Sequence, residues 1–241
     1  MTSTRTALVT GSTSGIGLGI ARRLHAAGWT VVLNGLDDAS RSNALTTELP
    51  GSHYIDADVS DPAAARRLVA TTVERTGHLD LLVNNAGIAR PIPHADLDAV
   101  EDEFWDLIMA VNLRGPWTLA RAARPHLAAR GGQIINVASI AGLTAAGSSI
   151  PYAVSKAGLI HLTRLLAKAL GPDIRVNAVA PGYIDTPLTH EWEELRTHVR
   201  SAAPARRLGA PDDVADAVLG LLTMSYVTGT IIPVAGGLEL L

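Results

Sequence analysis

The sequence predicts one doubly wound α/β domain, with a parallel sheet of about seven strands and helices on both faces. Short runs rich in valine, isoleucine and leucine alternate with longer helix-patterned segments from end to end. The runs are continuously apolar, which is typical of strands buried on both faces of a parallel sheet. Repeated strand–helix–strand order implies right-handed crossovers with helices on both faces.

The expected strands are short apolar segments, most of them followed by a turn or a helical pattern. They cover residues 6–10, 30–34, 54–59, 79–87, 133–139, 174–182 and 231–237. Helical patterns fill the intervals: residues 16–27, a polar stretch through 48, 62–75, 99–111, 116–130, 152–170, and two more between 183 and 230. No repeat, low-complexity tract or linker marks a second domain, so we expect residues 1–241 to form one unit.

Composition excludes several classes of protein. The net charge of −3 and the pI near 6.2 give no electrostatic footprint for nucleic acid or an anionic membrane. The chain has no cysteine, which excludes disulfides and thiolate sites, and its eight histidines lack a metal-ligand spacing, so we expect no metal. No apolar run reaches membrane-spanning length and the N-terminus lacks signal-peptide features, so we expect a soluble, cytoplasmic protein.

Glycines crowd the turn after the first expected strand. The segment LVTGSTSGIGLGIARRL (8–24) places Gly11, Gly15, Gly17 and Gly19 between that strand and the first helix. Glycine lets the backbone approach a ligand closely, and the N–H groups of a helix N-terminus suit a pyrophosphate. Glycines needed only for packing would give the same pattern. Their density at the first strand–helix junction favours a nucleotide, and the missing Gly-Lys-Ser/Thr excludes a P-loop.

A tyrosine and a lysine lie four residues apart in IPYAVSKAGLI (150–160). The chain has only two lysines, and on a helix Lys156 shares a face with Tyr152. A tyrosine is a poor base at neutral pH because its pKa lies near 10, and a nearby cation improves it by stabilising the phenolate. The pair therefore suits proton transfer to or from an oxygen of a ligand. A surface tyrosine beside a solvated lysine would give the same spacing.

Seven matches in series resemble one family. The loop TGSTSGIG (10–17) is similar to the cofactor loop of short-chain dehydrogenases/reductases. It is followed, in the order of that family, by DADV (56–59), NNAG (84–87), Asn112, Ser139, YAVSK (152–156) and PGYIDT (181–186). The resemblance covers nearly the whole chain and implies a single Rossmann-type domain that binds a dinucleotide and carries the catalytic residues.

The resemblance also implies a role for each matching residue. Tyr152 is the implied general acid/base, Lys156 lowers its pKa and binds a ribose, Ser139 contacts the substrate oxygen, and Asn112 holds a water of the proton relay. The implied cofactor-binding residues, besides Tyr152 and Lys156, are Gly11, Thr13, Ser14, Gly15, Ile16, Gly17, Asn34, Gly35, Leu36, Asp58, Val59, Asn85, Ala86, Gly87, Pro181, Gly182, Ile184 and Thr186.

Cofactor choice depends on the end of the second strand, where an acidic residue binds a ribose hydroxyl and a basic one a 2′-phosphate. The segment GLDD (35–38) offers no basic side chain there, and Ser14 stands where phosphate-preferring relatives often carry a cation. Asp37 and Asp38 would repel a phosphate. The nearest cation, Arg41, is several residues further on. NAD is therefore favoured over NADP.

The expected function is hydride transfer between a nicotinamide cofactor and a secondary alcohol or ketone, either like a 3-oxoacyl reductase or like a hydroxy-acid, sugar or polyol dehydrogenase. Two alternatives stay open: a cofactor-binding regulatory or scaffold protein without turnover, and a lyase or epimerase on the same fold. The apolar helical segments 116–130 and 152–170 favour a homotetramer, with a homodimer as the alternative.

Residues 186–204 follow the last motif and are the expected substrate loop. They carry Trp192 among the charges of HEWEELRTH (190–198). The segment suits a mobile lid that excludes water from the reacting oxygen. An ordered surface helix packed through Trp192 and Leu195 would explain the same residues.

Overall fold

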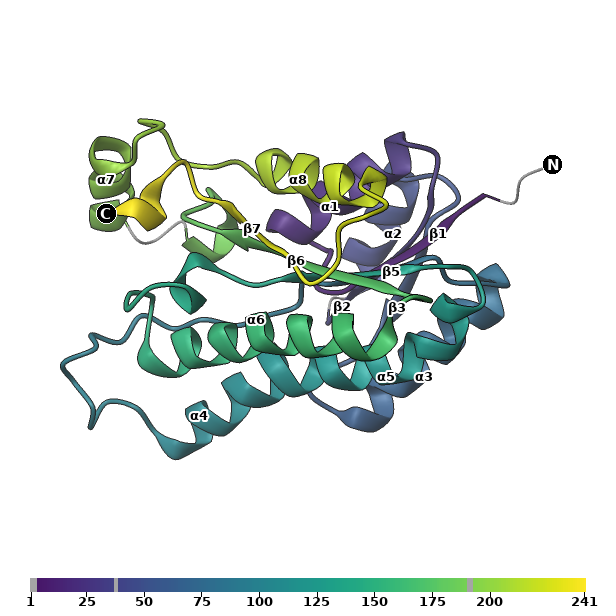
Figure 1. The fold of residues 1–241 in the computed structure, drawn as a ribbon, viewed down its shortest axis with the longest axis horizontal. Helices are drawn as coiled ribbons and strands as arrows, with labels where there is room; N and C mark the ends of the chain where they lie inside the picture. Colours follow the sequence, from purple (N-terminus) through teal and green to yellow (C-terminus); the bar gives the residue numbers. More distant parts are fainter. Residues whose placement is uncertain (1–3, 37–38, 190–192) are drawn as a thin grey trace.

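Seven strands form one parallel sheet in the computed structural model, which describes residues 4–36, 39–189 and 193–241. The sheet order is β3-β2-β1-β4-β5-β6-β7 (Figure 1). The strands are β1 (Thr6–Val9), β2 (Thr30–Gly35), β3 (His53–Asp56), β4 (Leu81–Asn84), β5 (Gln133–Val137), β6 (Arg175–Pro181) and β7 (Ile231–Val234). The predicted doubly wound domain is confirmed. The third strand ends at Asp56 and not at Val59, because Asp58 turns the chain by accepting a bond from the N–H of Ser60.

Helices cover both faces of the sheet (Figure 1). One layer contains α1 (Gly15–Ala26), α2 (Ala39–Glu48) and α8 (Pro211–Thr223), and the other contains α3 (Pro62–Thr76), α4 (Asp102–Met109), α5 (Gly115–Ala128) and α6 (Ile150–Leu170). The short helix α7 (Glu193–Ala202) lies near the C-terminus. Among the described helices, none combines the length and apolar character needed to cross a bilayer.

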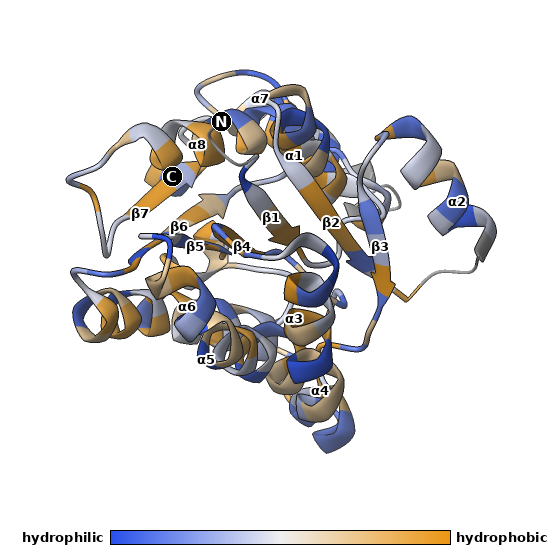
Figure 2. Cartoon of the chain, turned by 90° about the vertical axis from the view of Figure 1, so that its right-hand side faces the viewer, coloured by the Kyte–Doolittle hydropathy of each residue, from blue (hydrophilic) through white to orange (hydrophobic). Residues whose placement is uncertain are grey.

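The central strand β1 divides its side chains between two cores. Ala7 and Val9 pack with residues of α1 and α8, whereas Leu8 packs with residues of α3 and α5. This alternation follows from the period of two along a strand. Because both faces are covered, the middle of the sheet is mostly hydrophobic, as the orange parts of β2, β6 and β7 show (Figure 2).

The helix expected over residues 99–111 differs from the structure. It begins at Asp102, because the Asp96 side chain accepts a bond from the N–H of Ala99 and a turn occupies the preceding residues. It does not break at Asn112. A π-helical stretch, Ala110–Arg114, joins α4 directly to α5 and contains Asn112. Single π turns in α-helices are frequent at functional sites.

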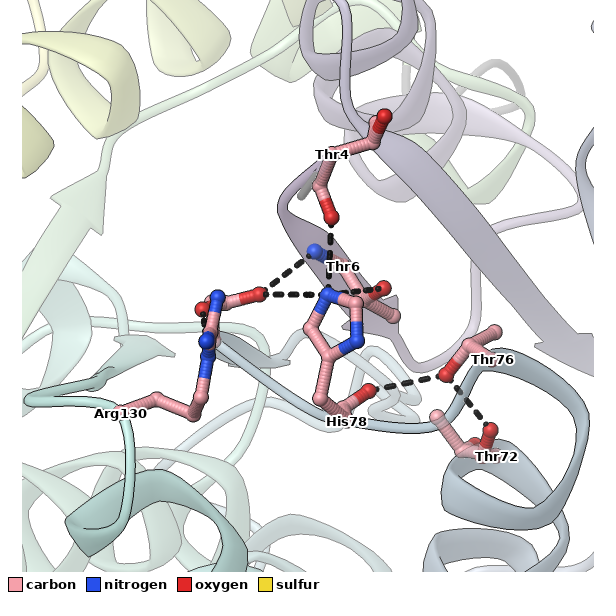
Figure 3. Close-up of polar contacts among 7 residues, drawn as sticks. Thr4, Thr6, Thr72, Thr76, His78 and Arg130 are labelled. Carbon is pink, nitrogen blue, oxygen red and sulfur yellow. Dashed lines mark hydrogen bonds and ion pairs between the residues drawn. The ribbon is translucent and has the colours of Figure 1, made fainter. Parts of the chain in front are cut away.

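A polar network closes the sheet edge where the strands begin. Asp80, just before β4, accepts bonds from the backbone N–H of Thr6 at 2.8 Å and from Nε of Arg130 at 3.0 Å. The His78 ring lies against β1, with Nε2 2.8 Å from the carbonyl oxygen of Thr4 and 3.3 Å from the Thr6 hydroxyl (Figure 3). The polar side chains at this edge of the sheet therefore stabilise the fold.

Candidate active site

The opposite edge, where the strands end, holds a cavity of about 430 Å³. It includes residues that follow β1 and β4, the neighbours at which the strand order reverses, and ligands of open α/β sheets bind at such a point. Nearly all of the predicted site residues line it: Gly11, Thr13, Ser14, Gly15, Ile16, Asn34, Gly35, Leu36, Asp58, Val59, Asn85, Ala86, Gly87, Ser139, Tyr152, Lys156, Pro181, Gly182, Ile184 and Thr186. Gly17 and Asn112 are not among the lining residues.

The glycine-rich turn brings backbone close to this cavity. Gly11 has φ +57° and Gly15 has φ +54°, a region that side chains rarely adopt. A Cβ at Gly17 would lie 2.3 Å from the carbonyl oxygen of Gly11, so Gly17 permits the helix to pack on the turn and does not face a ligand. The first turn of α1 carries no acidic side chain, which leaves its N–H groups suited to an anionic phosphate.

Asn85 holds the turn from the neighbouring strand. Its Nδ2 donates to the carbonyl oxygens of Thr10 and Gly11, both at 2.9 Å. The Thr10 hydroxyl oxygen in turn accepts the N–H groups of Asn85 at 3.0 Å and Ala86 at 3.1 Å. These bonds fix the end of β4 against the turn, so Asn85 shapes the cavity mainly through the backbone it anchors.

Another wall of the cavity lies at the ends of β2 and β3. Asn34 donates through Nδ2 to the carbonyl oxygens of Ile55 at 3.1 Å and Ala57 at 3.0 Å, which orders this wall. Leu36 is 71% exposed, although it lines the cavity. Arg41 reaches back from α2 and donates to the carbonyl oxygen of Thr13 in the glycine-rich turn. The predicted aspartates 37 and 38 lie outside the described residues.

Tyr152 and Ser139 meet at the end of β5. Burial raises the pKa of Tyr152, and a hydrogen bond with the Ser139 side chain opposes that rise. Ser139 also accepts a bond from the N–H of Ala141 at 3.1 Å, which orients its hydroxyl oxygen as the cap of a short 3₁₀ turn. Two hydroxyl groups therefore face one cavity from a strand end and a helix.

Lys156 is almost completely buried beside Tyr152, with 5% of its surface exposed. Its Nζ donates to the carbonyl oxygen of Val137 at 3.0 Å. Burial lowers the pKa of Lys156 from 10.5 to about 8. Among the described residues, the Val137 carbonyl is the one acceptor for the ammonium group, which leaves two N–H donors for a ligand or water.

Asn112 lies behind the cavity, fully buried. Its Nδ2 donates to the carbonyl oxygen of Ile88 at 3.0 Å and to Oγ of Ser155 at 3.1 Å, and its Oδ1 accepts the N–H of Ile88 at 2.9 Å. A Cβ on Gly87 would lie 3.3 Å from Asn112 Oδ1 and 3.4 Å from Lys156 Nζ. Gly87 thus leaves a small polar space between these two side chains.

The segment after β6 forms the remaining wall. A Cβ on Gly182 would lie 2.7 Å from Cβ of Ala235, so the chain passes close to the C-terminal segment there. Thr186 packs toward the glycine-rich turn, since a Cβ on Gly15 would lie 3.4 Å from its side chain. The predicted substrate loop contains α7, whereas Trp192 lies outside the described residues and the side chain of Leu195 is not described.

Sequence reasoning missed several lining residues, which are neighbours of predicted positions and carry no polar motif. They are Ala57, Val111, Val137 and Ala138, whereas the lining residues Pro187 and Leu188 belong to the predicted substrate loop and Ile88 directly follows the NNAG segment. Their only signal was adjacency to a strand end. Arg90, which follows the NNAG segment, stacks 4.0 Å from the centre of the Phe104 ring and pairs with Glu101 at 3.3 Å.

Known proteins resemble the chain over its whole length. A family profile described as enoyl-(acyl carrier protein) reductase matches residues 11–239. A Streptomyces violaceoruber protein named as a ketoacyl reductase of the granaticin polyketide synthase is 52% identical over 98% of this chain and 96% of its own. The 3-oxoacyl-(acyl-carrier-protein) reductase FabG of Thermotoga maritima is 39% identical over 96% of both chains.

Solved structures give the same picture. A protein from Burkholderia xenovorans, described as a short-chain dehydrogenase/reductase, superposes with a TM-score of 0.91 at 36% identity and covers 100% of both chains. A blue fluorescent protein from a metagenomic library, solved in complex with NADPH, superposes with a TM-score of 0.88 at 34% identity over 97% of both chains.

Proposed function

Because this chain belongs to the short-chain dehydrogenase/reductase family, we propose that it reduces the ketone of a 3-oxoacyl thioester to the secondary alcohol. Its reaction type is that of an NAD(P)-dependent oxidoreductase acting on CH–OH or ketone groups. The substrate class is supported by the ketoacyl reductases among its relatives. The observation that carries the proposal is that Ser139, Tyr152 and Lys156 line one cavity together with the glycine-rich turn.

The nicotinamide ring, when bound, supplies or accepts the hydride. In our proposal Tyr152 donates its hydroxyl proton to the carbonyl oxygen as hydride arrives, and Ser139 holds the same oxygen with a second hydroxyl. The hydrogen bond between Ser139 and the tyrosine supports this pairing. Proton transfer by a positioned side chain contributes about 10²–10⁴-fold to rate.

Lys156 acts on Tyr152 through charge and holds the cofactor ribose through its remaining donors. The space beside Gly87, bounded by Lys156 Nζ and Asn112 Oδ1, is polar on two sides and suits one water. Both Asn112 amide hydrogens are used within the protein, so its side chain offers that water an acceptor. We propose that this water takes part in a relay that returns a proton to Tyr152 after the tyrosine has donated its own.

We propose NAD as the preferred cofactor, because neither Gly35 nor Leu36 offers a charge to a 2′-phosphate. The bond of Arg41 to Thr13 supports NADP as the alternative, since it brings a guanidinium to the turn that holds Ser14. Measurement of kcat/KM with both cofactors decides between them.

A homotetramer is proposed as the assembly. A groove of about 930 Å³ between α4, α5 and α6 carries exposed apolar side chains, among them Leu107, Trp117 and Leu165, and supports a contact between copies. Light scattering at micromolar concentration tests this assembly.

Residues 186–204 are proposed as the substrate loop. A cytoplasmic location completes the proposal, because an enzyme of this kind meets its soluble cofactor there.

The test of the function is a substrate panel followed by cofactor absorbance. Acetoacetyl-CoA, simple 3-hydroxy acids, aldoses and polyols are each assayed with NADH or NADPH, or with their oxidised forms. Turnover of the 3-oxoacyl thioester at least tenfold above the other classes is expected, which is about 1.4 kcal/mol in transition-state stabilisation. Preference for a sugar or polyol would refute the substrate class and leave the oxidoreductase assignment intact.

A further inference from the structure

Arg196 is a charged side chain that the fold buries on a short helix. It lies in α7, and only 9% of its surface is exposed. Its guanidinium donates two hydrogen bonds to the Asp185 carboxylate, from Nη1 to Oδ1 at 2.6 Å and from Nη2 to Oδ2 at 3.4 Å. A two-point pair of this kind fixes direction as well as distance.

Asp185 occupies a particular place in the cavity wall. Its neighbours on both sides, Ile184 and Thr186, line the cavity, whereas the Asp185 carboxylate is bound by α7. The Asp185 N–H donates to the carbonyl oxygen of Gly209 at 2.8 Å, and the Gly209 N–H donates to that of Tyr183 at 3.0 Å. The backbone of this wall is thus attached to the chain beyond α7.

Apolar contacts dock α7 without help from the ion pair. Tyr183 forms a small core with Val199 and Ala203, and Leu208 packs against it. These contacts hold the helix near the wall, and the bonds with Gly209 hold the backbone of the wall itself, but apolar packing is non-directional and does not set the direction in which the helix meets the Asp185 side chain. The ion pair adds a directional constraint at Asp185, which stands between two residues that line the cavity.

We propose that Asp185 and Arg196 are positioning residues that hold Ile184 and Thr186 against the nicotinamide half of the cofactor. This inference rests on the proposed function, and it assigns the cavity wall after β6 to the nicotinamide half of the cofactor. Neither residue lines the cavity, so each acts through the wall and not by touching the cofactor. The pair also links α7, in the proposed substrate loop, to cofactor placement.

The test compares the whole dinucleotide with ADP-ribose, which has the adenosine and pyrophosphate but lacks nicotinamide. Calorimetry gives the Kd of each ligand for the wild type, Asp185→Asn, Arg196→Met and Arg196→Lys. Asp216→Asn is the matched control, because it breaks an Arg–Asp pair between α1 and α8, away from the wall. Thermal melts of all variants report whether folding is retained.

We expect Asp185→Asn and Arg196→Met to weaken dinucleotide binding about tenfold or more while ADP-ribose binding changes less than about twofold. Arg196→Lys should recover part of the loss, because it keeps the charge without the fork. Equal weakening of both ligands, or of neither, would overturn the positioning role while the proposed function stands. A wild-type protein that binds neither ligand would overturn the proposed function itself, and this inference with it.

Discussion

Lys156 Nζ lies 5.7 Å from the centre of the Tyr152 ring while it donates a hydrogen bond to the carbonyl oxygen of Val137. The ammonium group thus sits beside the phenol in an enclosed place, with 5% of the Lys156 surface exposed. A guanidinium is wider and planar, so it cannot keep this position and the bond to Val137 together. We expect Lys156→Arg to lower kcat at least about 100-fold in steady-state assays despite its retained charge. Near-normal turnover would show that charge alone is sufficient.

Tyr152→Phe should remove turnover while cofactor binding survives. The ring packs against the cluster that contains Phe104 and Ile108, and phenylalanine preserves this packing. Only the hydroxyl that donates the proton is lost, so kcat should fall by about 10²–10⁴. Cofactor fluorescence titration should give nearly the wild-type Kd. Retention of more than about a tenth of the wild-type kcat would contradict the assignment of Tyr152 as the acid.

Lys156→Met should stabilise the cofactor-free protein at neutral pH. Burial lowers the pKa of Lys156 from 10.5 to about 8, so below pH 8 the folded protein carries a charge that costs free energy to bury. Between about pH 8 and 10.5 the unfolded chain binds the proton that the folded one has lost, so the stability of the wild type rises with pH there.

The expected gain for Lys156→Met is on the order of 1–3 kcal/mol at pH 7, and it should shrink as the pH approaches 10. Denaturant unfolding across this range measures it. Lys168→Met, at the exposed end of the same helix, is the control and should show no such pH dependence. A gain that is constant with pH would mean that packing, and not the buried charge, is responsible.

Gly87→Ala should impair proton transfer more than binding. The new methyl group would lie 3.3 Å from Asn112 Oδ1 and 3.4 Å from Lys156 Nζ, and it would fill the space proposed for the water. We expect kcat to fall about 10-fold or more, within the range of acid–base effects, with little change in melting temperature. Wild-type kcat in a well-folded Gly87→Ala protein would rule out a relay through this space.

Asp80→Asn should destabilise the fold and leave catalysis intact. Asp80 accepts bonds from Thr6 and Arg130 at the edge opposite the cavity. Loss of its charge leaves Arg130 without this carboxylate, and breaking such a partly buried pair costs about 2–4 kcal/mol. Urea unfolding should show the loss, and kcat at 25 °C should remain at the wild-type value. A large fall in kcat with unchanged stability would mean that the two edges of the sheet are coupled.

The sequence was sufficient for the architecture because the strands are buried on both faces and therefore read as continuous apolar runs. It was also sufficient for the residues that ring the cavity, since strand ends of a parallel sheet meet at one edge. The partners of Asn112 and Arg196 were out of reach. Those contacts depend on how each helix is rotated about its axis and on the course of the loops. Neither the rotation nor the course follows from the spacing of motifs along the chain. Arg41 is a further case, since a position several residues beyond β2 gave no sign that it returns to Thr13.

The π-helical stretch Ala110–Arg114 makes the site sensitive to chain length. A π turn contains one residue more than an α turn, and each residue of an α-helix advances about 100° around the axis. Deletion of one residue within this wide turn would restore regular α-helix with nearly the same phase on both sides, so Phe104 and Ile108, which are buried together, would keep their packing. What would change is the wide turn itself, from which the Asn112 side chain reaches the backbone of Ile88. A one-residue deletion at this point would therefore spare the packing of α4 and α5 and displace the polar group behind the cavity, while every catalytic side chain remained encoded.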